Sequence, residues 1–528
     1  MIKKTKVKKG ILVAPSMRPA IDSVHIIQPK RFDNRTVTIC LLSICLGLIA
    51  SYVAYSLTGL IGFFTNLFYY QRFSLTFVQP SEAPHWGLWV IILPVIGGLI
   101  VGLMARFGSS AIRGHGIPEA MEQILQNKSR IPWRMVFLKP ISAAISIGSG
   151  GPFGAEGPII ATGGALGSWL GQVVHISATE RKTLLAAGAA AGMAATFGSP
   201  ISAVLLAVEL LLFEFRPRSL VPVALASASA SSVRLELIGN QPVFIMPALS
   251  PVSGYEIIFY VLMGIFMGMG ALVVTRSVYF IEDCFEKLPI HWMWWPAIGG
   301  IAVGGIGFYF PKTLGVGYEN IDAILSGQLA PHIVIVFCLM KFLSWVISLG
   351  SGTSGGTLAP LFMIGGGLGT LVGTFSQNMI PWLHIDLKVT ALVGMASLFA
   401  GASGALLTSV IFAFETTGQQ LSLLPLLVGC CVSYLVSNYF MKNTIMTEKI
   451  ARRGVKVPNE YTPNFLESIP ASKLCHRHLV TISVDETIED ISEKITNDTN
   501  YSHQGYPVVD KMGELIGVVT QREIMNNK

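Results

Sequence analysis

The stretch GSGGPFGAEGP, residues 148–158, interrupts an apolar run with glycines and a single carboxylate. Glu156 is the only Asp, Glu, Lys or Arg between Pro140 and Thr179. Glycine lets a ligand approach the backbone closely, and proline is well suited to the first turn of a helix. The stretch therefore predicts that a short apolar helix ends at Gly-Ser-Gly. A new helix should begin near Pro158, with Glu156 at its start.

The composition of the chain is that of an integral membrane protein. Of its 528 residues, 52% are hydrophobic and 13% are charged, whereas ordinary soluble domains carry about 25% charged residues. Apolar windows recur from about residue 36 to 440, and several reach the roughly 20 residues that a helix needs to cross a bilayer. Others, such as 136–150 and 158–173, are too short to cross alone.

The net charge of +7 gathers at the two edges of the apolar region, within residues 3–9 and 442–453. The positive-inside rule then predicts cytoplasmic termini and a multi-pass protein of the plasma (inner) membrane; the pattern does not indicate nucleic-acid binding. Residues 1–35 lack a signal-peptide cleavage pattern, and the seven cysteines lack metal-ligand spacing. Lys139 and Arg276, at helix flanks, are expected to extend toward the membrane interface.

The opening stretch has a second copy further along the chain. Residues 139–171 align without a gap on 341–373, an offset of 350 − 148 = 202, and 14 of the 33 positions are identical. Two further pairs of segments keep the same order: 114–125 with 315–325, and 198–209 with 402–415. The membrane region therefore consists of two homologous halves, at about 40–235 and 255–455.

Such halves predict an anion pathway. Repeats with interrupted helices place the breaks near the bilayer midplane, where helix N-termini carry unpaired N–H groups and partial positive charge. Irregular backbone is tolerated there only where it lines a cavity or is covered by protein. Leu358 stands where the other half has Glu156 (156 + 202 = 358). We expect Glu156 to compete with a transported anion and to release the site when protonated. A structural glutamate satisfied by backbone donors is the alternative.

Three motifs carry a resemblance to the CLC family of chloride channels and chloride/proton exchangers. GHGIPE at 114–119 resembles the family's G-S-G-I-P, GAEGP at 154–158 resembles G-K/R-E-G-P, and GTLAP at 356–360 resembles G-x-F-x-P. The resemblance spans about residues 40–455. It implies an all-α integral membrane protein built as a CLC-type inverted repeat of tilted and broken helices. It also implies a homodimer in membrane lipid, with one chloride pathway in each subunit and no enzymatic activity.

The resemblance makes Glu156 the gating residue and proton carrier. The anion-binding positions that it implies are His115, Gly116, Ile117, Gly154, Ala155, Gly157, Gly356, Thr357, Leu358 and Met446. His115 replaces the serine of the family's first motif. A histidine N–H can also donate a hydrogen bond, and it becomes cationic if protonated. The alternative is a packed histidine that faces away from the site.

Two further departures leave proton coupling open. Met446 occupies the position of the family's central tyrosine, with Tyr439 as a less favoured substitute. Leu210 follows Glu209, where many exchangers of the family carry an inner proton-transfer glutamate. Exchange of the anion for protons is favoured because a titratable Glu156 remains. A passive chloride channel is the alternative.

A different class of function is a remote alternative. GTSGG at 352–356 fits the G-x-S-x-G pattern of serine hydrolases and the G-x-S-G of rhomboid intramembrane proteases, with Ser354 as the nucleophile. Catalysis would need a histidine within hydrogen-bond reach, and the downstream candidate is His384. The first copy of the repeat has Pro152 in place of Ser354, which disfavours a protease.

The C-terminal part of the chain is predicted to be a separate module. Residues 479–495 predict a strand and an amphipathic helix, and 505–527 predict two strands joined by a turn at 511–513, then a short helix. This pattern resembles one CBS motif. The chain thus divides into an N-terminal cytoplasmic segment at 1–35, a membrane domain at 36–455, and a linker with a small α/β CBS module at 456–528.

The function of the module is left open by the sequence. CBS motifs work in pairs, so pairing across a dimer is expected of a single one. The family often uses these modules to sense adenine nucleotides, and Thr520 and Glu523 occupy the positions of the usual ribose-contacting Thr-x-x-Asp. A structural, dimerising role is the alternative. We expect no other cofactor and no metal.

Overall fold

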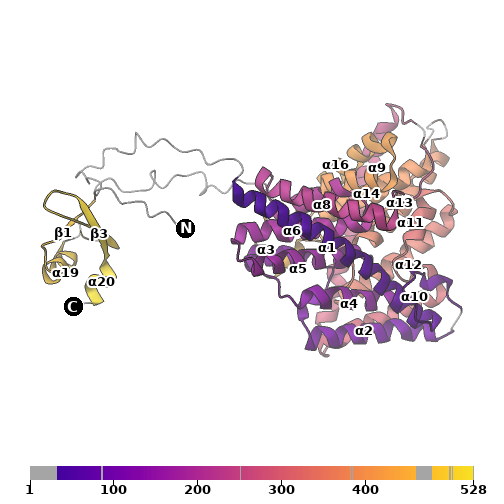
Figure 1. Cartoon of the computed structure of the whole chain (residues 1–528). Helices are drawn as coiled ribbons and strands as arrows, with labels where there is room; N and C mark the ends of the chain where they lie inside the picture. Colours follow the sequence, from indigo (N-terminus) through magenta and orange to yellow (C-terminus); the bar gives the residue numbers. More distant parts are fainter. Residues whose placement is uncertain are drawn as a thin grey trace. The chain divides into compact units, whose positions relative to one another are not determined.

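The computed structural model describes residues 33–84, 87–249, 251–380, 382, 385–458, 479–498, 501 and 503–526. The chain divides into two compact units, one of residues 31–461 and one that contains 462–528 together with 1–30. Within the described residues, the larger unit consists of helices and connecting loops, and the smaller one holds a sheet with two helices (Figure 1).

The first half of the larger unit runs from α1 to α8. Its helices are α1 (Asn34–Thr65), α2 (Trp89–Phe107), α3 (Ile117–Gln126), α4 (Met135–Gly148), α5 (Glu156–Val173), α6 (Ala178–Phe197), α7 (Pro200–Leu206) and α8 (Pro217–Ile238). Short 3-10 or π turns adjoin them: η1 (Asn66–Tyr70), η2 (Pro80–Glu82), η3 (Ser110–Ile112) and η4 (Ala207–Leu212).

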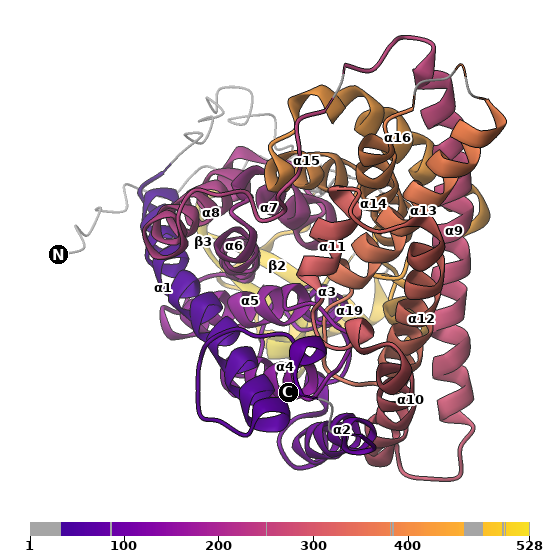
Figure 2. The same ribbon diagram turned by 90° about the vertical axis from the view of Figure 1, so that its right-hand side faces the viewer.

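The second half repeats this order from α9 to α16, as the sequence alignment predicts. Its helices are α9 (Glu256–Glu286), α10 (Trp295–Tyr309), α11 (Tyr318–Leu325), α12 (Pro331–Gly350), α13 (Leu358–Met379), α14 (Leu387–Ser403), α15 (Leu406–Thr417) and α16 (Leu423–Phe440), followed by α17 (Glu448–Arg452). The short turns are η5 (Trp292–Trp294), η6 (Pro311–Thr313) and η7 (Gln420–Ser422). Contacts between α2 and α10 and between α7 and α15 join the two halves (Figure 2).

Helix lengths agree with a multi-pass membrane protein. Within the described residues, seven helices are long and apolar enough to cross a membrane: Asn34–Tyr70, Trp89–Phe107, Pro217–Ile238, Glu256–Glu286, Pro331–Gly350, Leu358–Met379 and Gln420–Phe440. Shorter apolar helices, such as α4 and α15, lie between them in the sequence. The mixture of long and short helices confirms the predicted architecture of tilted and broken helices.

The break after Gly-Ser-Gly lies where the sequence predicts it, and the next helix has Glu156 at its start. α5 begins two residues before Pro158, and α13 begins at Leu358, two residues before Pro360. Proline is accommodated as the third residue because the N–H groups of the first turn have no acceptor within the helix. Each proline therefore lies inside the first turn, behind the residues that begin the helix.

A pair of glutamates joins the halves through helix N-termini. Glu209 accepts hydrogen bonds from the backbone N–H groups of Leu407 and Thr408, at 2.9 and 3.0 Å, where α15 begins. Glu415 accepts the equivalent bonds from 201–202, at 2.9 and 2.8 Å, where α7 begins. A carboxylate is stabilised at a helix N-terminus by the unpaired N–H groups and the helix dipole. Each of the two equivalent glutamates therefore caps the N-terminus of a helix in the other half.

The smaller unit contains a three-stranded sheet in the order β1-β2-β3. Its elements are β1 (Ile482–Ser483), α19 (Ile488–Asn497), β2 (Gly505–Val509), β3 (Leu515–Thr520) and α20 (Gln521–Asn526). β1 pairs parallel with β2, and β2 pairs antiparallel with β3. The turn between β2 and β3 contains Gly513 with a φ of +77°, a value that favours glycine. The predicted small α/β module is confirmed.

Glycines let the central helices of each half pack at backbone distance. A Cβ atom added to Gly163 on α5 would lie 2.1 Å from the carbonyl oxygen of Gly188 on α6, and the reverse distance is also 2.1 Å. In the second half, Gly365 on α13 and Gly394 on α14 have the corresponding distances of 2.6 and 2.4 Å. All four distances are far below van der Waals contact, so larger residues at these positions would push the helices apart.

We predict that Gly188→Ala lowers the melting temperature of the purified protein. The added methyl group meets a backbone oxygen that cannot rotate away, and overpacking of this kind costs about 1–3 kcal/mol. Gly305→Ala on α10 is the matched control, because nothing lies within 4 Å of its added Cβ. Equal melting temperatures for the two variants would contradict this account of the α5–α6 contact.

Candidate functional site

The Gly-rich loops of the two halves meet through their backbones. Gly356 donates a hydrogen bond from its N–H to the carbonyl oxygen of Gly154, at 3.0 Å, and the two residues form an isolated antiparallel bridge. A Cβ atom added to Gly157 would lie 3.1 Å from the Cα atom of Gly356. The start of α5 and the loop before α13 are therefore in contact.

Each of these loops is also held by the other half. Gly114, just before α3, donates to the carbonyl oxygen of Thr353 at 3.2 Å. Gly315, just before α11, donates to that of Gly150 at 3.2 Å. The loop before the short third helix of one half thus lies against the Gly-Ser-Gly loop of the other. These hydrogen bonds between loops of opposite halves bring the starts of α3, α5, α11 and α13 to one place.

Glu156 lies buried at this place as the first residue of α5. Its Oε1 atom accepts a hydrogen bond from the hydroxyl of Tyr318, at 2.9 Å. Its Oε2 atom has no hydrogen-bond partner among the described residues. A Cβ atom added to Gly356 would lie 2.9 Å from this Oε2 atom. A Cβ atom added to Gly154, in the loop before α5, would lie 1.7 Å from the same oxygen, so the carboxylate lies between its own loop and the loop that begins α13.

Two of the predicted N–H donors are already engaged. Gly116 donates its N–H to the carboxylate of Glu119 at 2.7 Å, and Gly356 donates to Gly154 at 3.0 Å. These bonds close the first turn of α3 and pair the two loops, so neither N–H is free for an anion. The assignment of Gly116 and Gly356 as anion-binding positions stays a prediction.

The other predicted positions lie at the starts of three helices. Ile117 is the first residue of α3, Ala155 is the N-cap of α5, and Thr357 and Leu358 are the N-cap and first residue of α13. All four are buried. Because the first N–H groups of a helix have no acceptor within it, these starts direct donors to a common region.

His115 lies between this region and a charged cavity of about 650 Å³. The cavity is lined, among others, by His115, Arg113, Glu119, Tyr279, Glu282 and Lys449. The imidazole is buried, and its Nδ1 atom has no hydrogen-bond partner among the described residues. A Cβ atom added to Gly157 would lie 2.0 Å from the carbonyl oxygen of His115. The backbone of His115 thus contacts α5 while its side chain lines the cavity.

Met446 is buried in the loop between α16 and α17, and Tyr439 does not replace the missing tyrosine. The Tyr439 side chain is 83% exposed near the end of α16. A phenol does reach this loop, because the hydroxyl of Tyr279 on α9 donates to the carbonyl oxygen of Ile445 at 2.8 Å. Tyr279 also lines the charged cavity. No pattern in the sequence indicates this contact, since no motif surrounds Tyr279.

Lys139 does not extend to the membrane interface as expected from the sequence. It is buried, and its Nζ atom donates to the carbonyl oxygens of Ile112 and Gly114, at 2.9 and 2.8 Å. Lys341, its counterpart in the repeat, donates in the same way to two carbonyl oxygens of the loop 313–315, at 2.9 Å each. A buried ammonium group requires such partners. Each lysine therefore braces the loop before a short helix.

Among the described residues, the Ser354 side chain bonds to another hydroxyl group rather than to a base. It is buried, and its Oγ atom accepts a hydrogen bond from the Ser142 hydroxyl at 3.2 Å. His384, the candidate base, lies outside the described residues. The Ser354 side chain therefore links α4 to the loop before α13.

Comparison with known proteins decides the family. The model of the family described as voltage gated chloride channel matches residues 96–438, well over half of the chain. The chain belongs to this family. A CBS domain model also matches residues 471–527, which confirms the resemblance of the C-terminal module.

Related proteins of this family are transporters and channels. A putative chloride channel protein, ClcB-like, from Ralstonia nicotianae is 27% identical over 380 residues, covering 71% of this chain and 88% of that protein. The H(+)/Cl(-) exchange transporter ClcA of Salmonella arizonae is 26% identical over 435 residues, covering 79% and 92%. The crystal structure of a slow cyanobacterial Cl-/H+ antiporter has a TM-score of 0.72 at 22% identity, covering 80% of this chain and 98% of that one. The last similarity confirms the CLC-type fold.

In the CBS module, the two predicted nucleotide contacts bind each other. Thr520 donates from its backbone N–H and its hydroxyl to Glu523, at 2.8 and 2.7 Å, and Glu523 donates its N–H back to the hydroxyl at 3.3 Å. This reciprocal pair is a capping box at the start of α20. The geometry favours the structural alternative for these residues.

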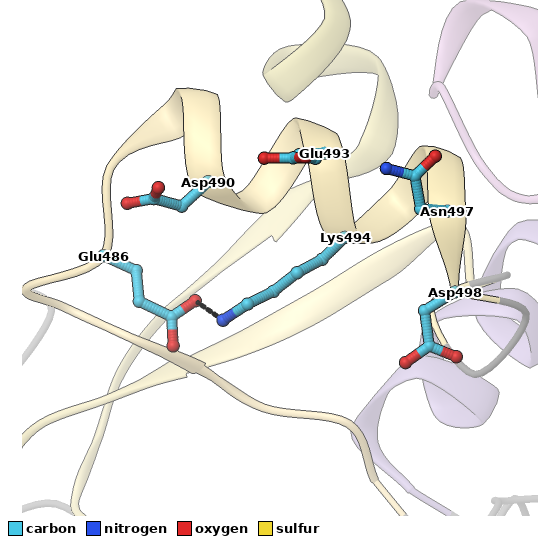
Figure 3. A pocket seen from close by; sticks show the side chains of 6 residues that line it. All are labelled: Glu486, Asp490, Glu493, Lys494, Asn497 and Asp498. Carbon is cyan, nitrogen blue, oxygen red and sulfur yellow. Dashed lines mark hydrogen bonds and ion pairs between the residues drawn. The ribbon is translucent and has the colours of Figure 1, made fainter.

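A cavity of about 430 Å³ on the same module is acidic. Figure 3 shows its lining side chains, which are Glu486, Asp490, Glu493, Lys494, Asn497 and Asp498. The Lys494 ammonium group is paired with Glu486 at 3.0 Å. Excess negative charge opposes the phosphates of a nucleotide. Among the described residues, no cluster of His, Cys, Asp and Glu could hold a metal ion.

We predict that His115→Ser changes both the anion selectivity and the pH dependence of flux in liposomes. The substitution removes the buried imidazole whose Nδ1 atom is unpaired, and with it a group that can donate a hydrogen bond and can gain a charge. His332→Ser, at an exposed position on α12, is the control. A variant with wild-type selectivity and pH profile would identify His115 as a packing residue.

We predict that Thr520→Ala weakens the hydrogen-exchange protection of α20 in a pH-dependent way. The hydrogen bonds from Thr520 hold the pKa of Glu523 below its usual value. Because the folded pKa is the lower one, this stabilisation is present above the unfolded value of about 4.3 and is lost as the pH falls through the folded value. The difference between wild type and variant should therefore shrink in acid. Thr487→Ala, which removes the cap of α19, should leave α20 unchanged.

Proposed function

We propose that the chain transports chloride or a similar small anion across the membrane in exchange for protons, with Glu156 as the titratable plug of the pathway. One observation carries this proposal. A buried carboxylate at the start of α5 faces the backbone that begins α13, with one oxygen unpaired. Membership of a family whose curated relatives include H(+)/Cl(-) exchange transporters supports the same reaction.

The plug works through competition for the same donors. An ionised Glu156 occupies the region where the N–H groups of Thr357 and Leu358 point, and it excludes an anion by like charge. Protonation removes that charge, so the side chain leaves and an anion takes its place. The buried ammonium groups of Lys139 and Lys341 stay in place in both states and favour anions over cations.

The passive channel remains the second candidate because of Leu210. This residue is buried in η4 and cannot carry a proton, although many exchangers of the family have a glutamate there. Other carboxylates are near the proposed pathway, since Glu119 and Glu282 line the charged cavity beside His115. We propose that protons reach the site through this cavity, which keeps exchange ahead of passive conduction.

We propose that the protein is a homodimer in the plasma (inner) membrane, with both termini in the cytoplasm. Ile201 on α7 and Leu407 on α15 are 58% and 48% exposed, although their N–H groups are held by the partly buried carboxylates of Glu415 and Glu209. A surface that contains two carboxylates is poorly suited to lipid, so a second subunit is the better neighbour. In the tail, the exposed apolar side chains of Ile516 and Val518 support pairing with a second CBS module.

We predict that purified wild-type protein in liposomes takes up protons when driven by a chloride gradient. Glu156→Gln should abolish this proton movement and make the remaining chloride flux independent of pH, because glutamine cannot be charged. Glu236→Gln, at an exposed position on α8, is the control and should behave as wild type.

Two outcomes would change the proposal. Wild-type chloride flux without proton uptake would favour the channel over the exchanger. Flux through Glu156→Gln that keeps the wild-type pH profile would remove Glu156 from the role of plug altogether.

A further inference from the structure

Tyr318 contacts the carboxylate of Glu156 from the opposite half of the protein. It is the first residue of α11, and its hydroxyl donates to Oε1 of Glu156 at 2.9 Å. Its ring packs edge-on against Phe197 and Phe244, with centroid distances of 6.0 and 6.2 Å. The hydroxyl is therefore aimed at the carboxylate by a ring that two aromatic neighbours hold in place.

We propose that Tyr318 is a latch, a positioning residue that holds the ionised Glu156 side chain in the anion site. The inference rests on the proposed role of Glu156 as plug. It adds that the hydrogen bond from Tyr318 sets how readily the Glu156 side chain leaves the site. A hydroxyl donor binds a carboxylate more strongly than a protonated carboxyl group, because the hydrogen bond is then charge-assisted. The latch is thus strongest in the closed state and weakens when Glu156 takes up a proton.

The loop that carries Tyr318 is anchored on both sides. Gly315 donates to the carbonyl oxygen of Gly150, in the loop that leads to Glu156, at 3.2 Å. Lys341 donates to the carbonyl oxygen of Gly315 at 2.9 Å. Gly317, the N-cap of α11, has a φ of +78°, which favours glycine. The latch and the plug are therefore tied through a short, hydrogen-bonded route, so their relative position does not depend on the hydrogen bond between them.

The internal repeat provides a built-in comparison. Ile117 begins α3 as Tyr318 begins α11 (318 − 117 = 201), and Leu358 begins α13 as Glu156 begins α5. Glu156 of the first half binds Tyr318 of the second, whereas the equivalent positions, Leu358 of the second half and Ile117 of the first, are both apolar. The scaffold does not need the polar pair, since Ile117 and Leu358 are both buried at the equivalent positions. The hydroxyl of Tyr318 therefore serves to bind the carboxylate and is not required by the packing of the fold.

The test is the pH profile of chloride flux in liposomes for wild type, Tyr318→Phe, Glu156→Gln and the double variant. Loss of the hydroxyl removes stabilisation of the ionised plug, so the plug is released at a higher pH. We expect the midpoint of flux activation in Tyr318→Phe to move by about one pH unit toward higher pH, as roughly tenfold weaker binding of the charged form requires. Tyr260→Phe, a buried tyrosine on α9, should leave the midpoint unchanged.

The double variant separates the latch from the plug. If the latch acts through the carboxylate, Tyr318→Phe has no further effect when Glu156 is already glutamine. A pH-independent Glu156→Gln together with an unshifted Tyr318→Phe would overturn the latch and leave the plug standing. A Glu156→Gln variant with the wild-type pH profile would overturn both.

A second substitution keeps the test independent of folding. Tyr318→Ile copies the residue found at the equivalent position of the first half, and it should shift the midpoint in the same direction as Tyr318→Phe. Melting temperature and elution volume establish that each variant is folded before flux is measured. A purely structural role for Tyr318 would alter these two measurements and leave the midpoint in place, which would also overturn the latch.

Discussion

The arrangement of the site depends on backbone pairing between loops of opposite halves. Gly114 and Gly315 each donate to a loop that belongs to the other half, and Gly356 donates to Gly154. Backbone hydrogen bonds at membrane depth are costly to leave unmade. The pairing therefore satisfies hydrogen-bonding groups of the irregular backbone, and the helices that follow it still begin with unpaired N–H groups. Any residue with a side chain at Gly157 or Gly356 would separate these segments.

The buried lysines and the buried carboxylate, taken together, are distributed unequally between the two halves. Each half supplies one buried lysine to the carbonyl oxygens of the loop before its short third helix, but only one half supplies a carboxylate at the break. The two breaks therefore differ in one buried side chain, a carboxylate in the first half and an apolar residue in the second. The unpaired N–H groups at the helix starts add partial positive charge to both. In the proposed mechanism, these helix starts attract the anion and protonation of Glu156 decides whether the site is vacant.

The sequence predicted much of this fold, because the repeat and the glycine-rich breaks are local patterns. It predicted that the two breaks form one pathway, whereas the backbone pairing of Gly154 with Gly356 is seen only in the structure. It was wrong about Lys139, since a lysine at a helix flank has the same local pattern whether it extends to the interface or turns inward to carbonyl oxygens. It missed Tyr318 as a partner of Glu156, because the two residues are 162 positions apart and no motif includes the tyrosine.

These failures share a physical cause. The repeat constrains backbone, and backbone is what the glycine, proline and helix-capping patterns report. The proposed function depends on side chains that differ between the two equivalent halves. Such single differences form no periodic pattern that could be detected in the sequence. Aligning the halves does make them visible, because Tyr318 stands opposite Ile117 and Glu156 opposite Leu358 in a scaffold that accepts either pair. In this duplicated membrane protein, comparison of the equivalent positions therefore points to Tyr318 and Glu156, the hydrogen-bonded polar pair on which the proposed plug and latch rest.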